Sequence, residues 1–425
     1  MNKKSNFKNE LTDIDGIAGT QIAYLNLGDV IANLKASGYK GPFALGDLII
    51  SSLNRELAIS AAKSAGITES EITLKTIVEY SDLDDADKER ILSLQDYMFD
   101  WKIRDVRDTR VTNGFYACCI EMSEEKAMIA FRGSESMNSL EFKRNWFEAD
   151  LALLNSREGT EQQRATEIYL DELLRKGLLN KYSKLFPVGH SLGGNLATHA
   201  LICTANDEKK RGLFNKIKRA YNYDGPGFSE EYLHTYKDAI QRAAHKIKHA
   251  KWSAVGDLLF NIPGVQIVYC AINEGLHLDN LLERIKYKVI TRHSTKSLVF
   301  DKNGMAIEGK QDIVSRGFSL ISKAVDIIVP ERLTIEAYAV TDWLFDKLLS
   351  VEYGEHINLG KPSWAERSAE NGSILGMCGL CIKNMFRVFK EGMLAVRGKT
   401  PFAPALAGAN GTIAPSVRRP SGYER

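Results

Sequence analysis

The chain has 425 residues, of which 44% are hydrophobic and 26% are charged. This composition is typical of a soluble globular protein and excludes a mainly disordered or fibrous chain. Lys and Arg (56) nearly balance Asp and Glu (54), so the net charge of +2 does not indicate a nucleic-acid-binding protein.

The six cysteines are too few and too irregularly spaced for a disulfide scaffold, and we expect free thiols in a reducing compartment. The N-terminal lysines are not followed by an apolar run, so no Sec-type signal peptide is predicted. No stretch of about 18 apolar residues predicts a membrane-spanning helix. We therefore expect a cytoplasmic location, and Sec-independent secretion is also compatible with the sequence.

Four segments follow one another along the chain. We predict a helical N-terminal addition, an α/β core, a helical C-terminal addition and a disordered tail rich in Pro, Gly, Ala and Ser. Their ranges are 1–95, 96–305, 306–398 and 399–425.

Within the first segment, residues 45–53 have apolar side chains at helical spacing, and residues 81–87 form an acidic helix start. From about residue 112, short apolar runs typical of strands alternate with helical patterns. Strands are predicted at 114–122, 126–131, 185–188, 219–223 and 245–250, and helices at 161–177 and 195–202. This alternation predicts an α/β fold with a mainly parallel central sheet flanked by helices.

The strongest motif is Gly189-His-Ser-Leu-Gly-Gly194, a G-x-S-x-G sequence between a predicted strand and a predicted helix. That context is what a nucleophile elbow requires, because the glycines let strand and helix pass close to each other. The hydroxyl of Ser191 then lies at a helix N-terminus, where developing negative charge is favoured. We predict Ser191 as the nucleophile of a serine hydrolase.

A serine hydroxyl needs a base, and an acid and a histidine are expected after it in the chain. His293 fits best, because residues 287–292 read as a strand or an approach to the site and His293 begins the loop after them. The remaining histidines lie on the elbow, in helical stretches, in a predicted strand or in connecting stretches: His190, His199, His234, His245, His249, His277 and His356.

Two aspartates are candidates for the acid that orients the histidine. Asp257 follows a predicted strand and lies between Ser191 and His293 in the chain, whereas Asp224 ends the preceding strand. Asp224 stands before Gly-Pro, a common turn, so it also fits a capping role. We predict Asp257 and keep Asp224 as the alternative acid.

A tetrahedral oxyanion needs two preorganised N–H donors. One is expected from the backbone of Leu192, directly after the nucleophile. The other is expected from Ser134 in the run Ala130-Phe-Arg-Gly-Ser, where a predicted strand ends, with the Ser134 hydroxyl as a third donor.

The runs AFRGSES…NW…D and VGHSLGGNLA together resemble the lipase class 3 group of α/β hydrolases, including its bacterial members, over residues 95–300. The resemblance implies an α/β-hydrolase fold, Ser191 as nucleophile, Ser134 as oxyanion residue and a lid at 135–150. It also implies Asp257 as the acid, since Gly-Asp-x-x-x-x-x-Pro resembles the loop that carries the acid in that group. Asp-Gly-Pro-Gly at Asp224 resembles a segment typical of the bacterial members, which is why Asp224 is kept as the alternative acid.

Residues 374–396 form an amphipathic helix pattern with Lys383, Arg387 and Lys390 opposite an apolar stripe. Packing on its own domain is the preferred interpretation, and peripheral contact with a membrane or with a partner protein is the alternative. His245 and His249 have i, i+4 spacing but lack the Glu of a zinc protease, so we interpret them as structural. No cofactor site, metal site or nucleic-acid partner is predicted.

The sequence thus predicts a serine hydrolase that cleaves esters of fatty acyl lipids, as a lipase or phospholipase A does, through an acyl-enzyme intermediate. One alternative is an esterase or thioesterase acting on small soluble acyl compounds. Another is an exported lipolytic effector whose helical region binds a partner.

Overall fold

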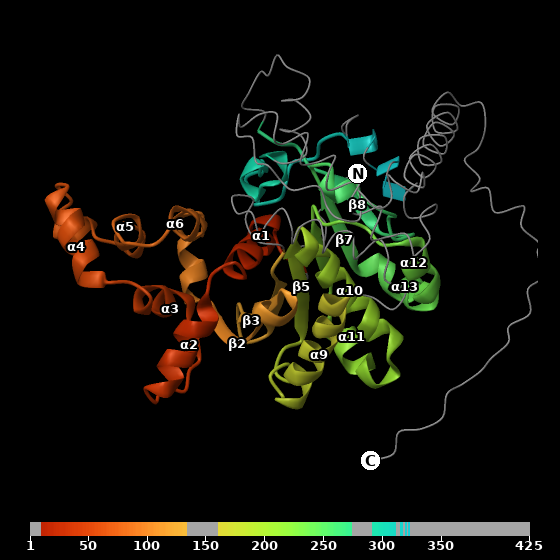
Figure 1. The fold of residues 1–425 in the computed structure, drawn as a ribbon, viewed down its shortest axis with the longest axis horizontal. Coiled ribbons are helices and arrows are strands. Elements are labelled where there is room, and N and C mark those ends of the chain that lie inside the picture. The colour runs from red at the N-terminus through yellow and green to blue at the C-terminus, as the bar shows by residue number, and fades with distance from the viewer. Residues whose placement is uncertain are drawn as a thin grey trace, which may run out of the picture.

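The computed structural model describes residues 10–133, 160–273, 291–311, 315–317, 319–320 and 322–323. Its central feature is an eight-stranded sheet in which the strands lie side by side in chain order (Figure 1). The strands are β1 (Phe43–Ala44), β2 (Lys102–Thr109), β3 (Phe115–Glu121), β4 (Lys126–Phe131), β5 (Lys184–His190), β6 (Ala220–Tyr223), β7 (Ile247–Lys251) and β8 (Gln266–Tyr269). The three pairings from β1 to β4 are antiparallel, and the four from β4 to β8 are parallel.

The crossover helices cover one face of this sheet. They are α9 (Glu161–Arg175), α10 (Leu192–Asn206), α11 (Arg211–Lys216), α12 (Glu230–Thr235) and α13 (Lys237–Ala243). Because the parallel strands advance in one direction, right-handed crossovers place their helices on the same side. Ile129 and Phe131 of β4 belong to the same buried cluster as Leu196 and Leu201 of α10.

The opposite face is covered by the N-terminal helix α1 (Asp13–Ile22). Side chains alternate along β4, so Met128 and Ala130 join the cluster that contains Ile17 and Ile22 of α1. The side chain of Thr12 caps the helix by accepting a hydrogen bond from the N–H of Asp15. Both faces of the sheet are therefore buried, as the alternation of strands and helices predicted.

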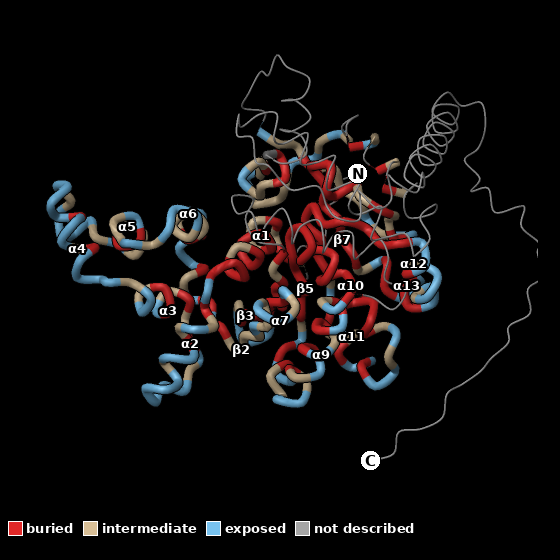
Figure 2. The backbone as a smooth tube through the Cα atoms, in the orientation of Figure 1, coloured by how far each residue is buried: buried red, intermediate tan, exposed pale blue. Residues whose placement is uncertain are grey.

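Five further N-terminal helices extend away from the antiparallel end of the sheet (Figure 1). They are α2 (Leu27–Ala36), α3 (Leu45–Ser51), α4 (Arg55–Ser64), α5 (Leu74–Glu79) and α6 (Asp85–Leu92). Figure 2 shows that α4 is largely exposed, whereas strands β3 to β7 and helix α10 are largely buried. Helices α3 and α6 confirm the two helices predicted in this segment.

Shorter helical turns complete the described part. They are α7 (Arg110–Asn113) and the 3-10 turns Glu69–Glu71, Asp96–Asp100, Glu208–Lys210, Ala244–Lys246, Val255–Asp257, Thr291–His293 and Thr295–Ser297.

All five predicted strands are confirmed in position, and so are the helices at 161–177 and 195–202. The sheet is less parallel than predicted, because β1, β2 and β3 add antiparallel pairings. The strand expected at 245–250 begins only at Ile247, since Ala244–Lys246 form a 3-10 turn. Residues 291–292 likewise begin a 3-10 turn and are not in a strand.

Several predicted features lie outside the described residues: Ser134, the lid at 135–150, the amphipathic helix at 374–396 and the tail at 399–425. The boundaries at 95, 305 and 398 remain predictions. Among the described residues, no helix combines the length and the apolar character needed to cross a membrane.

Candidate active site

Ser191 stands at the junction of β5 and α10, at the parallel part of the sheet. Its backbone has φ 58° and ψ −136°, in the left-handed half of conformational space that non-glycine residues rarely adopt. Such strain persists only where the surrounding structure enforces it, and it concentrates at functional sites. The strand, the sharp turn and the helix predicted around this serine are all present.

Steric contacts explain the glycines of the motif. A Cβ on Gly189 would lie 1.9 Å from the carbonyl oxygen of Gly193, and one on Gly193 would lie 2.2 Å from that of Phe131. A Cβ on Gly194 would lie 2.3 Å from Oδ1 of Asn222. Because two of these obstacles are backbone atoms, side chains at these positions would push strands β4 and β5 away from the start of α10.

The imidazole of His293 is bonded to Asp224. Its Nδ1 lies 2.7 Å from Oδ2 of Asp224, and both side chains are buried. His293 closes the 3-10 turn Thr291–His293, and Asp224 directly follows β6. The backbone of Asp224 also has a positive φ of 52°, a conformation that non-glycine residues rarely adopt.

The Asp224 carboxylate is held by groups that follow β7. Oδ1 accepts hydrogen bonds from the backbone N–H of Trp252 (2.8 Å) and of Ser253 (3.0 Å). The hydroxyl of Ser253 donates to Oδ2 and lies 3.2 Å from Nδ1 of His293. Burial raises the pKa of Asp224, but the bond and charge of His293, the Ser253 hydroxyl and the Trp252 N–H together bring that pKa below its ordinary value.

The other ring nitrogen of His293, Nε2, is buried and has no hydrogen-bond partner among the described residues. Nδ1 is already engaged by a carboxylate, so Nε2 is the nitrogen that can take a proton from a third group. The ring of His190, the residue immediately before Ser191, stacks on that of His293 with centroids 4.5 Å apart. The geometry thus brings the base candidate to the nucleophile elbow.

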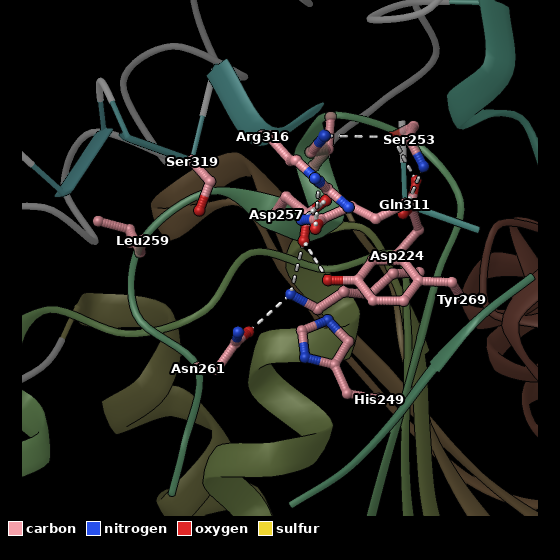
Figure 3. Close-up of polar contacts among 12 residues, drawn as sticks. Asp224, His249, Ser253, Asp257, Leu259, Asn261, Tyr269, Gln311, Arg316 and Ser319 are labelled. Carbon is pink, nitrogen blue, oxygen red and sulfur yellow. Dashed lines mark hydrogen bonds and ion pairs between the residues drawn. The ribbon is translucent and has the colours of Figure 1, made fainter. Parts of the chain in front are cut away.

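Asp257, the acid preferred from the sequence, has different partners. Its Oδ1 accepts from Nζ of Lys251 (3.1 Å) and from the hydroxyl of Tyr269 (3.3 Å), and Oδ2 accepts from Nε2 of Gln311 (3.0 Å). Figure 3 shows the side chains of Tyr269 and Gln311 beside Asp257. Lys251 also donates to Oδ1 of Asn261 (2.6 Å). The preference for Asp257 is therefore corrected: its charge is paired with a buried lysine, and the carboxylate on His293 is that of Asp224.

The oxyanion candidates are described only in part. Leu192 is the first residue of α10, so its N–H is among those without an acceptor inside the helix. Gly133, the residue before Ser134, lies against the elbow: a Cβ there would be 3.1 Å from Cβ of Ser191 and 2.6 Å from the carbonyl oxygen of His190. Ser134 itself lies outside the described residues, and its role remains a prediction.

His199 and His249 have partners that indicate structural roles. His199 lies between the Tyr232 hydroxyl (2.7 Å) and the carboxylate of Glu167 (3.1 Å). His249 contacts the carbonyl oxygen of Gly225 (2.9 Å), and His245 lies in a 3-10 turn outside β7. Among the residues that the structure describes, no group of three His, Cys, Asp or Glu side chains is arranged to bind a metal ion.

Sequence reasoning did not identify Ser253 or the role of His190. Ser253 stands two residues after the end of β7, and parallel strands end at one edge of the sheet, so its place beside Asp224 follows from the topology. His190 was present in the motif, but no pattern indicates which way its ring points.

One family model matches part of the chain. Residues 96–303, slightly less than half of the chain, match the model of the Mbeg1-like family, a lipase-like family. No curated protein matches the chain. A solved structure, "Crystal structure of M37 lipase", is 15% identical, covers 72% of this chain and 99% of its own, and superposes with a TM-score of 0.28. The segment that is similar to this lipase-like family holds Ser191, Asp224 and His293.

Proposed function

We propose that this chain is a serine hydrolase of the α/β-hydrolase type that cleaves carboxylic esters of fatty acyl lipids. The observation that carries the proposal is the bond between His293 and Asp224 next to a serine held at φ 58° at a strand-to-helix turn. This arrangement supplies the three groups that nucleophilic acyl transfer requires: a serine hydroxyl on a strained turn, a base, and a group that orients the base.

In the proposed mechanism, Ser191 Oγ attacks the acyl carbonyl while Nε2 of His293 takes its proton. Asp224 accepts the hydrogen bond from Nδ1, which fixes the tautomer and stabilises the imidazolium that forms. The N–H groups of Leu192 and Ser134 stabilise the oxyanion. His293 then returns the proton to the leaving alcohol, and water attacks the acyl-enzyme by the reverse sequence.

The choice of an acyl lipid as substrate is supported by the lipase-like family match and by the resemblance of two motifs to lipase class 3. Peripheral contact with a lipid surface, by the segments at 135–150 and 374–396, is part of the same proposal. A small soluble ester or thioester is the alternative substrate class.

The test is hydrolysis of short and long acyl esters, a triacylglycerol and labelled phospholipids by the wild type and by Ser191→Ala. A fluorophosphonate probe would label Ser191 in parallel. We expect labelling of the wild type only, and activity that is lost in the variant and rises when the substrate forms an interface. Ser191-dependent activity that is insensitive to interfaces would favour a soluble ester. No labelling and no Ser191-dependent turnover would overturn the proposal.

A further inference from the structure

His190 makes more contacts with the candidate site than a spacer in the G-x-S-x-G motif needs. It is the last residue of β5 and is only 8% exposed. Because side chains alternate along a strand, its ring points to the same face as Phe186 and Val188, the face covered by α1.

The ring of His190 stacks on two other rings. It stacks on Trp252, with centroids 5.8 Å apart and planes 9° apart. It also stacks on His293, with centroids 4.5 Å apart and planes 29° apart. Trp252 is the residue whose backbone N–H binds Asp224. The ring therefore joins the elbow to the segments that carry the acid and the base.

His190 also holds the backbone of His293, since its Nε2 lies 2.9 Å from the carbonyl oxygen of His293. A carbonyl oxygen only accepts, so Nε2 carries the proton and donates it. Burial, with a further contribution from His293, lowers the pKa of His190 to about 3. His190 thus stays a neutral donor across the pH range in which a histidine base works.

We propose that His190 is a positioning residue for His293, mainly through its Nε2–H donor, with the stacked ring as a secondary contact. His190 is bonded directly to Ser191 in the chain. Its contacts with the backbone and the ring of His293 therefore fix the position of the base relative to the nucleophile. Effective catalysis depends on such placement, and a displacement of about 1 Å lowers rates by on the order of 10²-fold. The inference rests on the proposed function and deepens it.

Two substitutions separate the two contacts. His190→Gln keeps an N–H donor near the position of Nε2 and removes the ring, whereas His190→Phe keeps a buried ring and removes the donor. His199→Gln is the matched control, because His199 is also a buried histidine and its hydrogen-bond partners are Glu167 and Tyr232, not His293 or Asp224. The measurements are kcat and KM with 4-nitrophenyl butyrate, fluorophosphonate labelling of Ser191, and the folded fraction by circular dichroism.

In His190→Phe we expect kcat to fall by on the order of 10²-fold with KM nearly unchanged, because placement and not binding is lost. His190→Gln is expected to recover a large part of that loss. His199→Gln should retain the wild-type kcat per folded molecule. Wild-type kcat in His190→Phe, or equal losses in both His190 variants, would overturn the inference.

Should His190→Phe fail to fold, His190→Asn replaces it, since its shorter amide does not reach the carbonyl oxygen of His293. The proposed function fails separately, through the absence of labelling and of Ser191-dependent turnover in the wild type. An active wild type with unaffected His190 variants would contradict the positioning role alone.

Discussion

Asp224 and Asp257 are both buried carboxylates near the carboxyl ends of the parallel strands, and their partners differ in kind. A buried carboxylate needs a counter-charge or several donors to remain ionised. Asp257 has the ammonium of Lys251 together with two neutral donors, so its charge is already balanced. Asp224 has neutral donors and His293, so it is the carboxylate that an imidazolium would compensate.

Asn substitutions at the two positions distinguish these environments. For Asp224→Asn we expect kcat to fall by on the order of 10⁴-fold, because an amide does not hold His293 in the productive tautomer. For Asp257→Asn we expect kcat within a few-fold of the wild type and a loss of about 3 kcal/mol of stability, since Lys251 is left buried without its counter-ion. Ester hydrolysis and urea unfolding of both variants provide the measurements. The opposite ranking of activities would restore Asp257 as the acid.

The Ser253 hydroxyl provides a prediction about pH. In Ser253→Ala, Asp224 loses one charge-assisted hydrogen bond, which corresponds to about 1.5–3 kcal/mol of unfolding free energy at pH 7. The folded-state pKa of Asp224 is lowered, so this stability is present above the unfolded pKa of about 3.9 and is lost as the pH falls through the lower folded value. Urea unfolding at several pH values should show the wild type and the variant converging below about pH 4.

Ser229→Ala is the control for that series. Ser229 is also buried, but its hydroxyl accepts from the N–H of Tyr232 at the start of α12, so no ionised partner is involved. Ser229→Ala should therefore lower the free energy of unfolding by about 1 kcal/mol, and this difference should stay constant over the same pH range. A difference for Ser253→Ala that is equally constant would show that the hydroxyl does not act on the charged form of Asp224.

At the scale of elements, the sequence predicted the five strands β3 to β7 and missed β1, β2 and β8. β3 and β4 are apolar runs, and buried strands of this kind are readily recognised. β2 reads Lys-Ile-Arg-Asp-Val-Arg-Asp-Thr, which suggests a polar segment. Its charges are paired across the fold, Arg107 with Glu172 of α9 and Asp105 with Lys176, and a sequence pattern does not reveal such long-range ion pairs.

The elbow shows which part of the site local pattern can predict. Strand, glycine turn and helix are encoded by the residues around Ser191, and all three were predicted from the G-x-S-x-G motif and the apolar runs that flank it. The choice between Asp224 and Asp257 depends on how the loop after β7 folds back over β6, where Trp252 and Ser253 donate to Asp224. That contact joins residues 28 and 29 positions apart, so neither aspartate could be selected from its neighbours in sequence.

A substitution of Gly193 tests the close packing of these elements. In Gly193→Ala, the new Cβ would lie 2.2 Å from the carbonyl oxygen of Phe131, so β4 and α10 must separate. We expect the free energy of unfolding to fall by about 1–3 kcal/mol and kcat to fall by on the order of 10²-fold. Gly212→Ala is the matched control, since no atom lies within 4 Å of the new Cβ and the position is helical. For Gly212→Ala, the free energy of unfolding measured in urea should rise by up to about 1 kcal/mol. Equal changes in the two variants would contradict the steric explanation.

At the scale of the whole molecule, the N-terminal helix α1 packs as part of the core. Its apolar side chains share one buried cluster with β4, β5 and β6, opposite the crossover helices. A buried ion pair reinforces this packing: both carboxylate oxygens of Asp13 lie 2.7 Å from Nζ of Lys248 on β7. Asp13 also accepts from the hydroxyl of Tyr223 and from the N–H of Ala306, so one side chain joins the first helix, the sheet and the segment after His293.

The Asp13–Lys248 pair therefore predicts how the N-terminal segment and the sheet unfold. Asp13→Ala leaves Lys248 buried without a counter-ion. We expect the free energy of unfolding, measured in urea, to fall by about 3–5 kcal/mol, in one cooperative transition.

Adding Lys248→Met removes the unpaired charge and fills its volume, so the double variant should be more stable than either single variant. Additive losses would mean that the two charges do not depend on each other, and a separate early transition would mean that α1 unfolds independently of the sheet. Because Asp13 also holds Ala306, the single variant should lose Ser191-dependent activity at a lower urea concentration than the wild type.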